Sequence, residues 1–479
     1  MTRIDRRTFV SSIGVSTALT GSASAARLWA PRKPTLDMIA QKLAGCSRDA
    51  AFSVAIDLIG EGADWKDLLG GSFLAGVKEV KPQPVGFQFH AVMMVESAFQ
   101  LATATKEENR LFPVFFNIDD MKRSQARDAQ RGDWVMQPRT DRATLRPEVA
   151  ERCLEKAMRD WDEELADRAI ASLYASMPKN KLFEVLWPLG ARDFTNIGHK
   201  AIWTAQAYRT LTRIGWQHGL PVLRSLMLGL LDGKGKDPSI AHYETNRKLS
   251  RGLPTTWRKG KADPAASVAL LQDLRSAKVD HASALVVDAI GRGLAPRSVW
   301  DAYRLLAAEM LIIKPGILPV HPTTAINSLQ FAFRTSRRET TKRVLLLQGA
   351  TWLLLYRNFL SMKLDKPIIE VIPAATERVA PNVILGTATK SKLQASRQVL
   401  ALPKKKLRAF EEFIRRNVFS KGTEHHLYKY TAAVLEDARR CHPSFANRLL
   451  AAAVHYVPAD GQRDARVYTR AKEALAKRK

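Results

Sequence analysis

The sequence predicts an all-α protein, and three observations support this fold class. Apolar residues recur at three- and four-residue steps over long segments such as 149–177, 299–313 and 445–457, which is the spacing of one face of an α-helix. Sustained alternation of apolar and polar residues, which is typical of a half-buried strand, is nearly absent. The one stretch with strand-like content, 369–385, contains prolines that favour a loop.

The first 25 residues have the pattern of an export signal. A basic start is followed by a modestly apolar stretch, 9–19, and by the small residues Ala-Ser-Ala at 23–25. The run RRTFV at 6–10 resembles the twin-arginine motif. We therefore expect a signal peptide over 1–25, contact with the twin-arginine translocase during export of the folded chain, and a periplasmic or secreted protein.

The remaining chain, 26–479, is predicted to be one large helical domain made of two helical halves. A polar segment rich in Gly and Pro, 232–264, separates the halves as a surface excursion or a linker, and a second excursion covers 366–406. The longest apolar run, 344–356, is shorter than the roughly 20 residues that cross a bilayer. It predicts a buried core helix and no integral membrane span.

Composition and charge limit the classes of function. The chain is 46% hydrophobic and 25% charged, with a net charge of +28, and removing the first 25 residues leaves +26. The cations are spread along the chain, and no nucleic-acid-binding motif accompanies them. We therefore expect a solubilising basic surface and no specific nucleic-acid partner. The alternative is a non-catalytic exported helical protein that binds an anionic partner through this surface.

Several familiar catalytic signatures are absent from the sequence. No GxGxxG opens a helix after a strand, so a built-in Rossmann site for a nicotinamide or flavin is not supported. No Walker A loop, GxSxG elbow or HExxH motif occurs. No histidine has a glutamate three residues before it, which excludes the ExxH ligands of di-iron bundles. The three cysteines are far apart and provide no metal pair.

Four histidines share one local context. His90, His199, His321 and His426 each stand near the start of an apolar helical stretch, after a segment that breaks a helix. Four helix starts that present imidazoles to a common centre would form a site suited to iron, copper, zinc or nickel. The alternative for each is a cap or a packed core residue. His218, which has apolar neighbours, is a further candidate for a catalytic role.

His426 is followed three residues later by a lysine in apolar company. The i, i+3 spacing of His426 and Lys429 places both on one face of a helix. An ammonium group cannot ligate a cation. Burial among Leu427, Tyr430 and Ala433 would, however, favour the neutral amine, which can add carbon dioxide to give a carbamate. We expect His425 to face another way.

Three blocks of the sequence resemble the questin oxidase-like family. The blocks are HKAIWTAQAYRTL at 199–211, PGILPVHPTTAINSLQFAF at 315–333 with the WLLLYRNF helix at 352–359, and TEHHLYKYTAAVLEDARRCHPSFANRLLAAA at 423–453. Their order and the HxxK spacing carry the resemblance, which extends patchily over 84–456. His90 stands for an early histidine of the family, although the Asn and Pro-Met of that family block are absent here.

The resemblance implies an enzyme, a mononuclear non-haem iron oxygenase. Its Fe(II) would be held by four histidines and a carboxylated lysine, which correspond to His90, His199, His321, His426 and Lys429. The implied reaction inserts oxygen from dioxygen into a small apolar substrate, such as a ketone or a polycyclic aromatic, by ring cleavage or Baeyer–Villiger chemistry.

Further expectations concern the substrate pocket and the reductant. Tyr430 joins His218 as a candidate catalytic residue. The nearby aromatic side chains would either line an apolar pocket or pack in the core, and they are Phe89, Trp203, Tyr208, Tyr428 and Tyr430. A second enzymatic alternative keeps the fold but consumes a free nicotinamide cofactor as reductant.

Overall fold

Helices make up the regular structure, as the apolar periodicity predicts. The computed structural model describes residues 33–139, 145–364, 366 and 368–477. Within these residues the chain forms 22 α-helices and five short 3₁₀-helices, and no strand beyond one isolated bridge between Lys261 and Leu294. The predicted all-α class is confirmed. The predicted signal peptide, 1–25, lies outside the described residues.

The first half of the chain contributes eleven α-helices. They are α2 (Leu36–Gly45), α3 (Ala51–Gly60), α4 (Trp65–Glu79), α5 (His90–Thr103), α6 (Leu111–Ala129), α7 (Pro147–Asp160), α8 (Glu163–Ser176), α9 (Lys179–Gly190), α10 (Thr195–Ile214), α11 (Gly219–Leu230) and α12 (Ser239–Leu249). Three 3₁₀-helices lie between them, η1 (Phe87–Phe89), η2 (Glu107–Asn109) and η3 (Trp216–His218), and η4 (Ser250–Gly252) follows α12.

The second half contributes the other eleven. They are α13 (Pro264–Ser276), α14 (Val279–Gly291), α15 (Pro296–Ile313), α16 (His321–Thr335), α17 (Glu339–Phe359), α18 (Pro381–Lys390), α19 (Lys392–Leu400), α20 (Lys404–Lys421), α21 (His425–Arg440), α22 (Ala446–Ala453) and α23 (Arg466–Ala476). The 3₁₀-helix η5 (Leu318–Val320) leads into α16.

Local capping explains where several helices begin. Asp64 precedes α4 and accepts hydrogen bonds from the backbone N–H groups of Lys66 and Asp67, while the Asp67 carboxylate accepts from the backbone N–H of Asp64. Asp263 caps α13 in the same way, ahead of a proline at the first helical position. Both arrangements satisfy N–H groups that a helix start leaves without partners.

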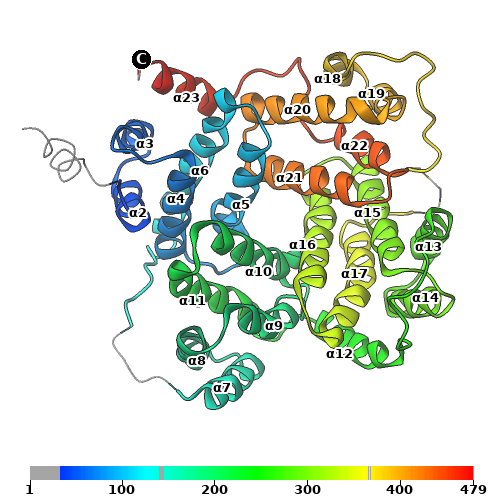
Figure 1. The fold of residues 1–479 in the computed structure, drawn as a ribbon, viewed down its shortest axis with the longest axis horizontal. Helices are drawn as coiled ribbons and strands as arrows, with labels where there is room; N and C mark the ends of the chain where they lie inside the picture. Colours follow the sequence, from blue (N-terminus) through cyan, green and yellow to red (C-terminus); the bar gives the residue numbers. More distant parts are fainter. Residues whose placement is uncertain (1–32, 140–144, 365, 367, 478–479) are drawn as a thin grey trace, which may run out of the picture.

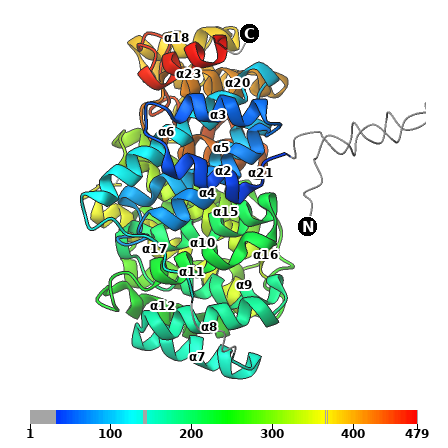
Figure 2. The same ribbon diagram turned by 90° about the vertical axis from the view of Figure 1, so that its left-hand side faces the viewer.

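The two halves of the chain form one domain. Helices α5 and α10 of the first half pack against each other. Helix α5 also packs against α21 of the second half, α10 packs against α16, and α16 packs against α21 (Figure 1). Viewed from the side, α18 and α23 lie at one end of the molecule and α7 and α8 at the other (Figure 2). The four packed helices thus form a junction between the two predicted halves.

Helix α17 contains the longest apolar run and lies in the core. Its run from Val344 to Tyr356 is buried except at Leu355, as the sequence predicts. Within the described residues, no helix is both long and apolar enough to cross a bilayer. The expectation of no integral membrane span holds for this part of the chain.

The polar segment 232–264 is folded and does not act as a linker. It contains α12, which packs against α14 and α17. Asn246 of α12 is buried, and its side-chain amide donates to Thr351 of α17. The glycines and prolines that suggested a linker stand outside this helix, before residue 239 and after residue 249. The second excursion, 366–406, likewise contains α18, α19 and the first residues of α20.

Candidate metal centre

Four histidines open four helices that meet at one place. His90 is the first residue of α5, His321 is the first residue of α16, and His426 is the second residue of α21. In α10 the backbone at 196–198 is not helical, so His199 begins the regular part of that helix. The predicted position of each histidine at a helix start is confirmed.

Glycines allow the loops before His90 and His199 to pass close to the cluster. Gly198 has φ +77°, and a Cβ there would lie 3.0 Å from both the Trp352 ring and the Tyr356 hydroxyl. Gly86 has φ +106°, and its Cβ would lie 3.1 Å from Nδ1 of His199. Both backbone conformations favour glycine, and both close approaches exclude a side chain.

The imidazole rings form a compact cluster with His90 at its middle. The centroid of the His90 ring lies 4.7 Å from that of His199, 4.4 Å from that of His426 and 6.3 Å from that of His321. His321 lies 4.9 Å from His199 and 5.0 Å from His426, again between ring centroids. The ligating atoms of His90, His199 and His321 all lie within 4.8 Å of one another, which suits a shared metal ion.

His425 also belongs to the cluster, so the expectation that it faces away is wrong. Its ring stacks on that of His90 at 4.3 Å between centroids, and its ligating atom lies within 4.8 Å of those of His90 and His426. Its Nδ1 lies 3.1 Å from the buried Asp120 carboxylate of α6. Adjacent helix residues point about 100° apart. Both histidines nevertheless line the same cavity.

Three of the histidines have one ring nitrogen fixed by an acceptor. Nδ1 of His321 lies 2.9 Å from the Ile317 carbonyl oxygen, and Nδ1 of His426 lies 2.6 Å from a carboxylate oxygen of Glu424. Nδ1 of His199 contacts the carbonyl oxygen of Asn196. Each Nδ1 therefore carries the proton and donates it, which leaves the lone pair on Nε2.

The opposite nitrogens of the same three rings have no partner. Nε2 of His199, of His321 and of His426 is buried and has no hydrogen bond to any described residue. A buried polar atom without a partner destabilises a fold by about 1–3 kcal/mol. Three such acceptors in one cluster, each with its tautomer fixed from behind, are what a metal ion would satisfy.

Lys429 lies inside this cluster and is almost completely buried. Its Nζ is 2.8 Å from Nδ1 of His90. Burial lowers the pKa of Lys429 to about 7, against the opposing effects of Glu424 and Asp120. The amine therefore exists in part as the neutral form near neutral pH. His90 differs from the other three ligand candidates because its Nδ1 faces this amine and not a carbonyl or carboxylate.

Burial also keeps the four imidazoles neutral. It lowers the pKa of His90, of His199 and of His321 well below the ordinary value, and the neighbouring His and Lys429 cations add to the effect. It lowers the pKa of His426 to about 4, although the Glu424 carboxylate acts in the opposite direction. Neutral imidazole is the form that binds a metal.

A cavity of about 730 Å³ opens onto the cluster. Five histidines contribute to its wall, together with apolar side chains and two arginines. The lining residues are Phe87, Gln88, His90, Arg127, Arg131, Phe194, Asn196, Ile197, His199, Ile317, Leu318, His321, Phe359, His425 and His426. The aromatic residues named from the sequence are not among them, and Phe89, Trp203, Tyr428 and Tyr430 are fully buried in the core.

The two residues predicted to be catalytic do not line this cavity. His218 lies in η3, where its Nδ1 is 3.8 Å from a carboxylate oxygen of Asp37 in α2. Tyr430 lies in α21 within the core, with its ring 5.5 Å from that of Tyr456. The structure therefore brings together His90, His199, His321, His426 and Lys429, but neither His218 nor Tyr430.

Two further carboxylates besides Asp120 support the cluster, and none of the three was identified from the sequence. Glu424 caps α21, contacts Nδ1 of His426 and accepts a hydrogen bond from the Tyr456 hydroxyl. Asp232 accepts from the backbone N–H of Val85 and from the side chain of Asn196, so it joins the loops before His90 and His199. The position of Glu424 just before the two adjacent histidines is the one signal in the sequence that points to such a role.

Comparison with protein-family models, curated proteins and solved structures finds no match to this chain. The functional interpretation therefore depends on the geometry of the histidine cluster and its cavity.

Proposed function

We propose that this chain is a metal-dependent oxidoreductase, a mononuclear non-haem iron oxygenase. The observation that carries the proposal is the set of three buried Nε2 atoms, on His199, His321 and His426, that have no partner within one cluster of imidazoles. His90 and Lys429 complete the donor set. The resemblance of the sequence to the questin oxidase-like family supports iron over other transition metals.

The chemistry of the donors fits a divalent metal. Neutral imidazoles are suitable ligands for ferrous iron. The buried Lys429 amine, with a pKa of about 7, can attack carbon dioxide. A nitrogen–carbon bond forms and one proton leaves, so the product is a carbamate anion with oxygen ligands. Four imidazoles and one carbamate would then surround Fe(II) with a net charge of about +1.

The protein would contribute binding, orientation and exclusion of water. Ferrous iron in this donor set would supply activation of dioxygen. The apolar cavity wall would hold a small apolar substrate, such as a ketone or a polycyclic aromatic, beside the imidazoles. The carbonyl and carboxylate acceptors behind His321, His426 and His199 would keep the rings oriented throughout the reaction.

Export through the twin-arginine route is part of the proposal. That route carries folded proteins, so a metal acquired in the cytoplasm would reach the periplasm or the medium inside its protein. The burial of Lys429 and His321 supports this order of events, because an ion enclosed by these residues is retained in the folded chain.

Metal analysis of the purified protein tests the proposal. Protein from cells supplied with iron is expected to hold about one equivalent of transition metal, and His321→Ala and Lys429→Ala are expected to hold much less. His281→Ala, at an exposed position on α14, is the matched control and should retain the metal. A wild-type protein without stoichiometric metal would contradict the proposal, as would a Lys429→Ala variant that binds the metal normally.

A further inference from the structure

The wall of the histidine cavity carries positive charge that is not balanced within the wall. Its lining includes Arg127 and Arg131 but no aspartate or glutamate. Arg131 donates one hydrogen bond to the side chain of Gln88, 3.1 Å away. Arg127 makes no hydrogen bond or ion pair with any described residue, although it lies near enough to Asp120 to help lower the pKa of that carboxyl. The two guanidinium groups are thus available to an anion that enters the cavity.

The same cavity has an apolar rim. Phe87, Ile317, Leu318 and Phe359 all line it, and each exposes about half of its side-chain surface. Nine large apolar side chains are exposed in the described part of the chain, and these four of them gather at one mouth. A group of exposed apolar side chains beside a cavity is typical of a surface that binds a ligand.

Helix α6 connects the histidine cluster with Arg127. Asp120 contacts His425, and Arg127 follows seven residues later. Positions seven apart lie on the same face of a helix, about 10 Å from each other along its axis. Arg131 follows just past the end of α6 and also lines the cavity. A cavity of about 730 Å³ that is lined by both the arginines and the imidazoles has room for a ligand longer than a single aromatic ring.

We propose that the ligand of this cavity is an elongated apolar monoanion, such as a polycyclic aromatic carboxylate. Its acidic group pairs with Arg127 and Arg131, and its apolar body lies against Phe87, Ile317 and Phe359 with the far end at the histidine cluster. The inference deepens the proposed function, since it names the substrate class of the same site. Binding itself does not require the metal, so the two proposals can fail separately.

Fluorescence titration with a matched pair of probes tests the inference. The probes are 2-anthracenecarboxylate and its uncharged amide, 2-anthracenecarboxamide, which differ in charge but hardly in shape. The wild-type protein is expected to bind the carboxylate about tenfold more tightly, which corresponds to about 1.4 kcal/mol. The double variant Arg127→Gln, Arg131→Gln should bind both probes with the affinity of the amide. Arg408→Gln, an exposed arginine at the start of α20, is the matched control and should keep the preference.

Each outcome decides the inference. Equal affinity of the two probes for the wild type would overturn it, and so would a preference that survives in the double variant or failure of both probes to bind. Ile317→Ser should weaken both probes equally, because it removes apolar contact and leaves the charge. Metal content is measured on the same samples. A preserved preference in a protein that binds no metal would support the acid-binding cavity and contradict only the iron centre.

Discussion

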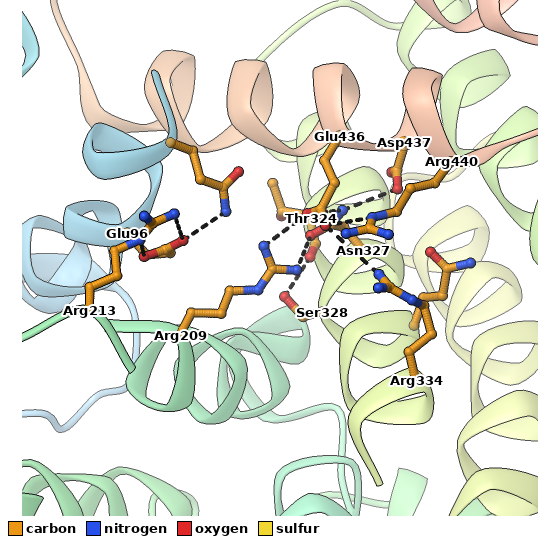
Figure 3. Close-up of polar contacts among 12 residues, drawn as sticks. Glu96, Arg209, Arg213, Thr324, Asn327, Ser328, Arg334, Glu436, Asp437 and Arg440 are labelled. Atoms are coloured by element: carbon orange, nitrogen blue, oxygen red, sulfur yellow. Dashed lines mark hydrogen bonds and ion pairs between the residues drawn. The ribbon is translucent and has the colours of Figure 1, made fainter. Parts of the chain in front are cut away.

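The helices that carry the histidines also carry a second polar group further along their length. His199 starts the regular part of α10, and Arg209 follows ten residues later, about 15 Å along the axis. Arg209 donates to Glu436 of α21 and to Asn327 of α16, and Asn327 also donates to Asp437 (Figure 3). We call these four residues, together with Arg304, the arginine–carboxylate network.

The two groups differ in whether charges pair with each other inside the protein, although Nε of Arg209 in the network has no hydrogen bond to a described residue. In the network each arginine faces a carboxylate, and the Glu436 carboxylate also accepts from Arg440. In the histidine cluster three buried acceptor nitrogens have no partner among the described residues. Charges that pair with each other hold the helices in register, whereas buried acceptors without partners are suited to bind a metal ion or a ligand. The comparison predicts that substitutions in the network reduce stability and that substitutions in the cluster reduce binding.

The largest effect on stability is expected from Arg304→Met. The Arg304 guanidinium is buried and pairs with Asp301 at 2.7 Å and with Asp437 at 3.2 Å. Its removal would leave two carboxylates buried without their cation, which destabilises a fold by about 3–5 kcal/mol. Urea denaturation measures the change. Arg292→Met, which breaks an exposed pair with Asp288 on α14, should lower the free energy of unfolding by less than about 1 kcal/mol. Equal losses of stability in the two variants would contradict a special structural role for the arginine–carboxylate network.

Acid should destabilise the metal-free protein through the histidine cluster. Burial lowers the pKa of His426 to about 4, whereas an unfolded histidine titrates near 6.5. Between these values the unfolded chain binds more protons, so stability is present above pH 6.5 and is lost as the pH falls toward 4. His426 contributes up to about 3 kcal/mol to this loss.

Denaturation of wild type and His426→Gln at pH 7 and pH 4.5 measures this contribution. The wild type should lose more stability than the variant over that interval. His455→Gln is the comparison: burial also lowers the pKa of His455 to about 4, and its ring nitrogen bonds to Ser396, so this variant should reduce the acid loss too, and the effects of the two substitutions should add. Identical pH profiles for wild type and His426→Gln would contradict the assignment of the acid effect to the cluster.

A smaller effect, on metal affinity, is expected from Glu424→Gln. Glutamine keeps the shape of the cap on α21 but accepts the His426 proton less strongly than a carboxylate does. Loss of such a supporting partner typically lowers metal affinity 10- to 100-fold. Competition with a chromophoric chelator measures the affinity for Zn²⁺ or Fe²⁺. Glu107→Gln, at an exposed position in η2, should leave the affinity unchanged. Unchanged affinity in Glu424→Gln would show that this carboxylate acts only as a cap.

Local patterns in the sequence predict the helices and the positions of four histidines. Apolar periodicity identifies α17 as a buried helix, and helix-breaking segments place His90 and His321 at helix starts. These features depend on neighbours within a few turns of the chain. The i, i+3 spacing of His426 and Lys429 is local in the same sense.

The supporting contacts could not be predicted because they join distant parts of the chain. Asp120 and His425 are separated by 305 residues, and Asp232 connects loops that precede His90 and His199. Nothing in the immediate sequence of Asp120 indicates its partner. The composition of the polar segment that begins at Asp232 favours an excursion or a linker. Composition does not indicate that Asp232 joins the loops before His90 and His199.

The smallest effect is expected from His218→Ala, although the sequence places His218 among the catalytic candidates. Its apolar neighbours suggested a position near the site, but they belong to α11, which packs away from the cluster against α4, α8 and α10. His218 itself contacts Asp37, whose side chain is largely exposed. The His218 side chain is only 16% exposed, so its truncation should lower the free energy of unfolding by about 1 kcal/mol. Metal content and probe affinity should match the wild type. A loss of metal in His218→Ala would mean that the metal site extends to η3. It would contradict the conclusion that His218 lies outside the histidine cluster.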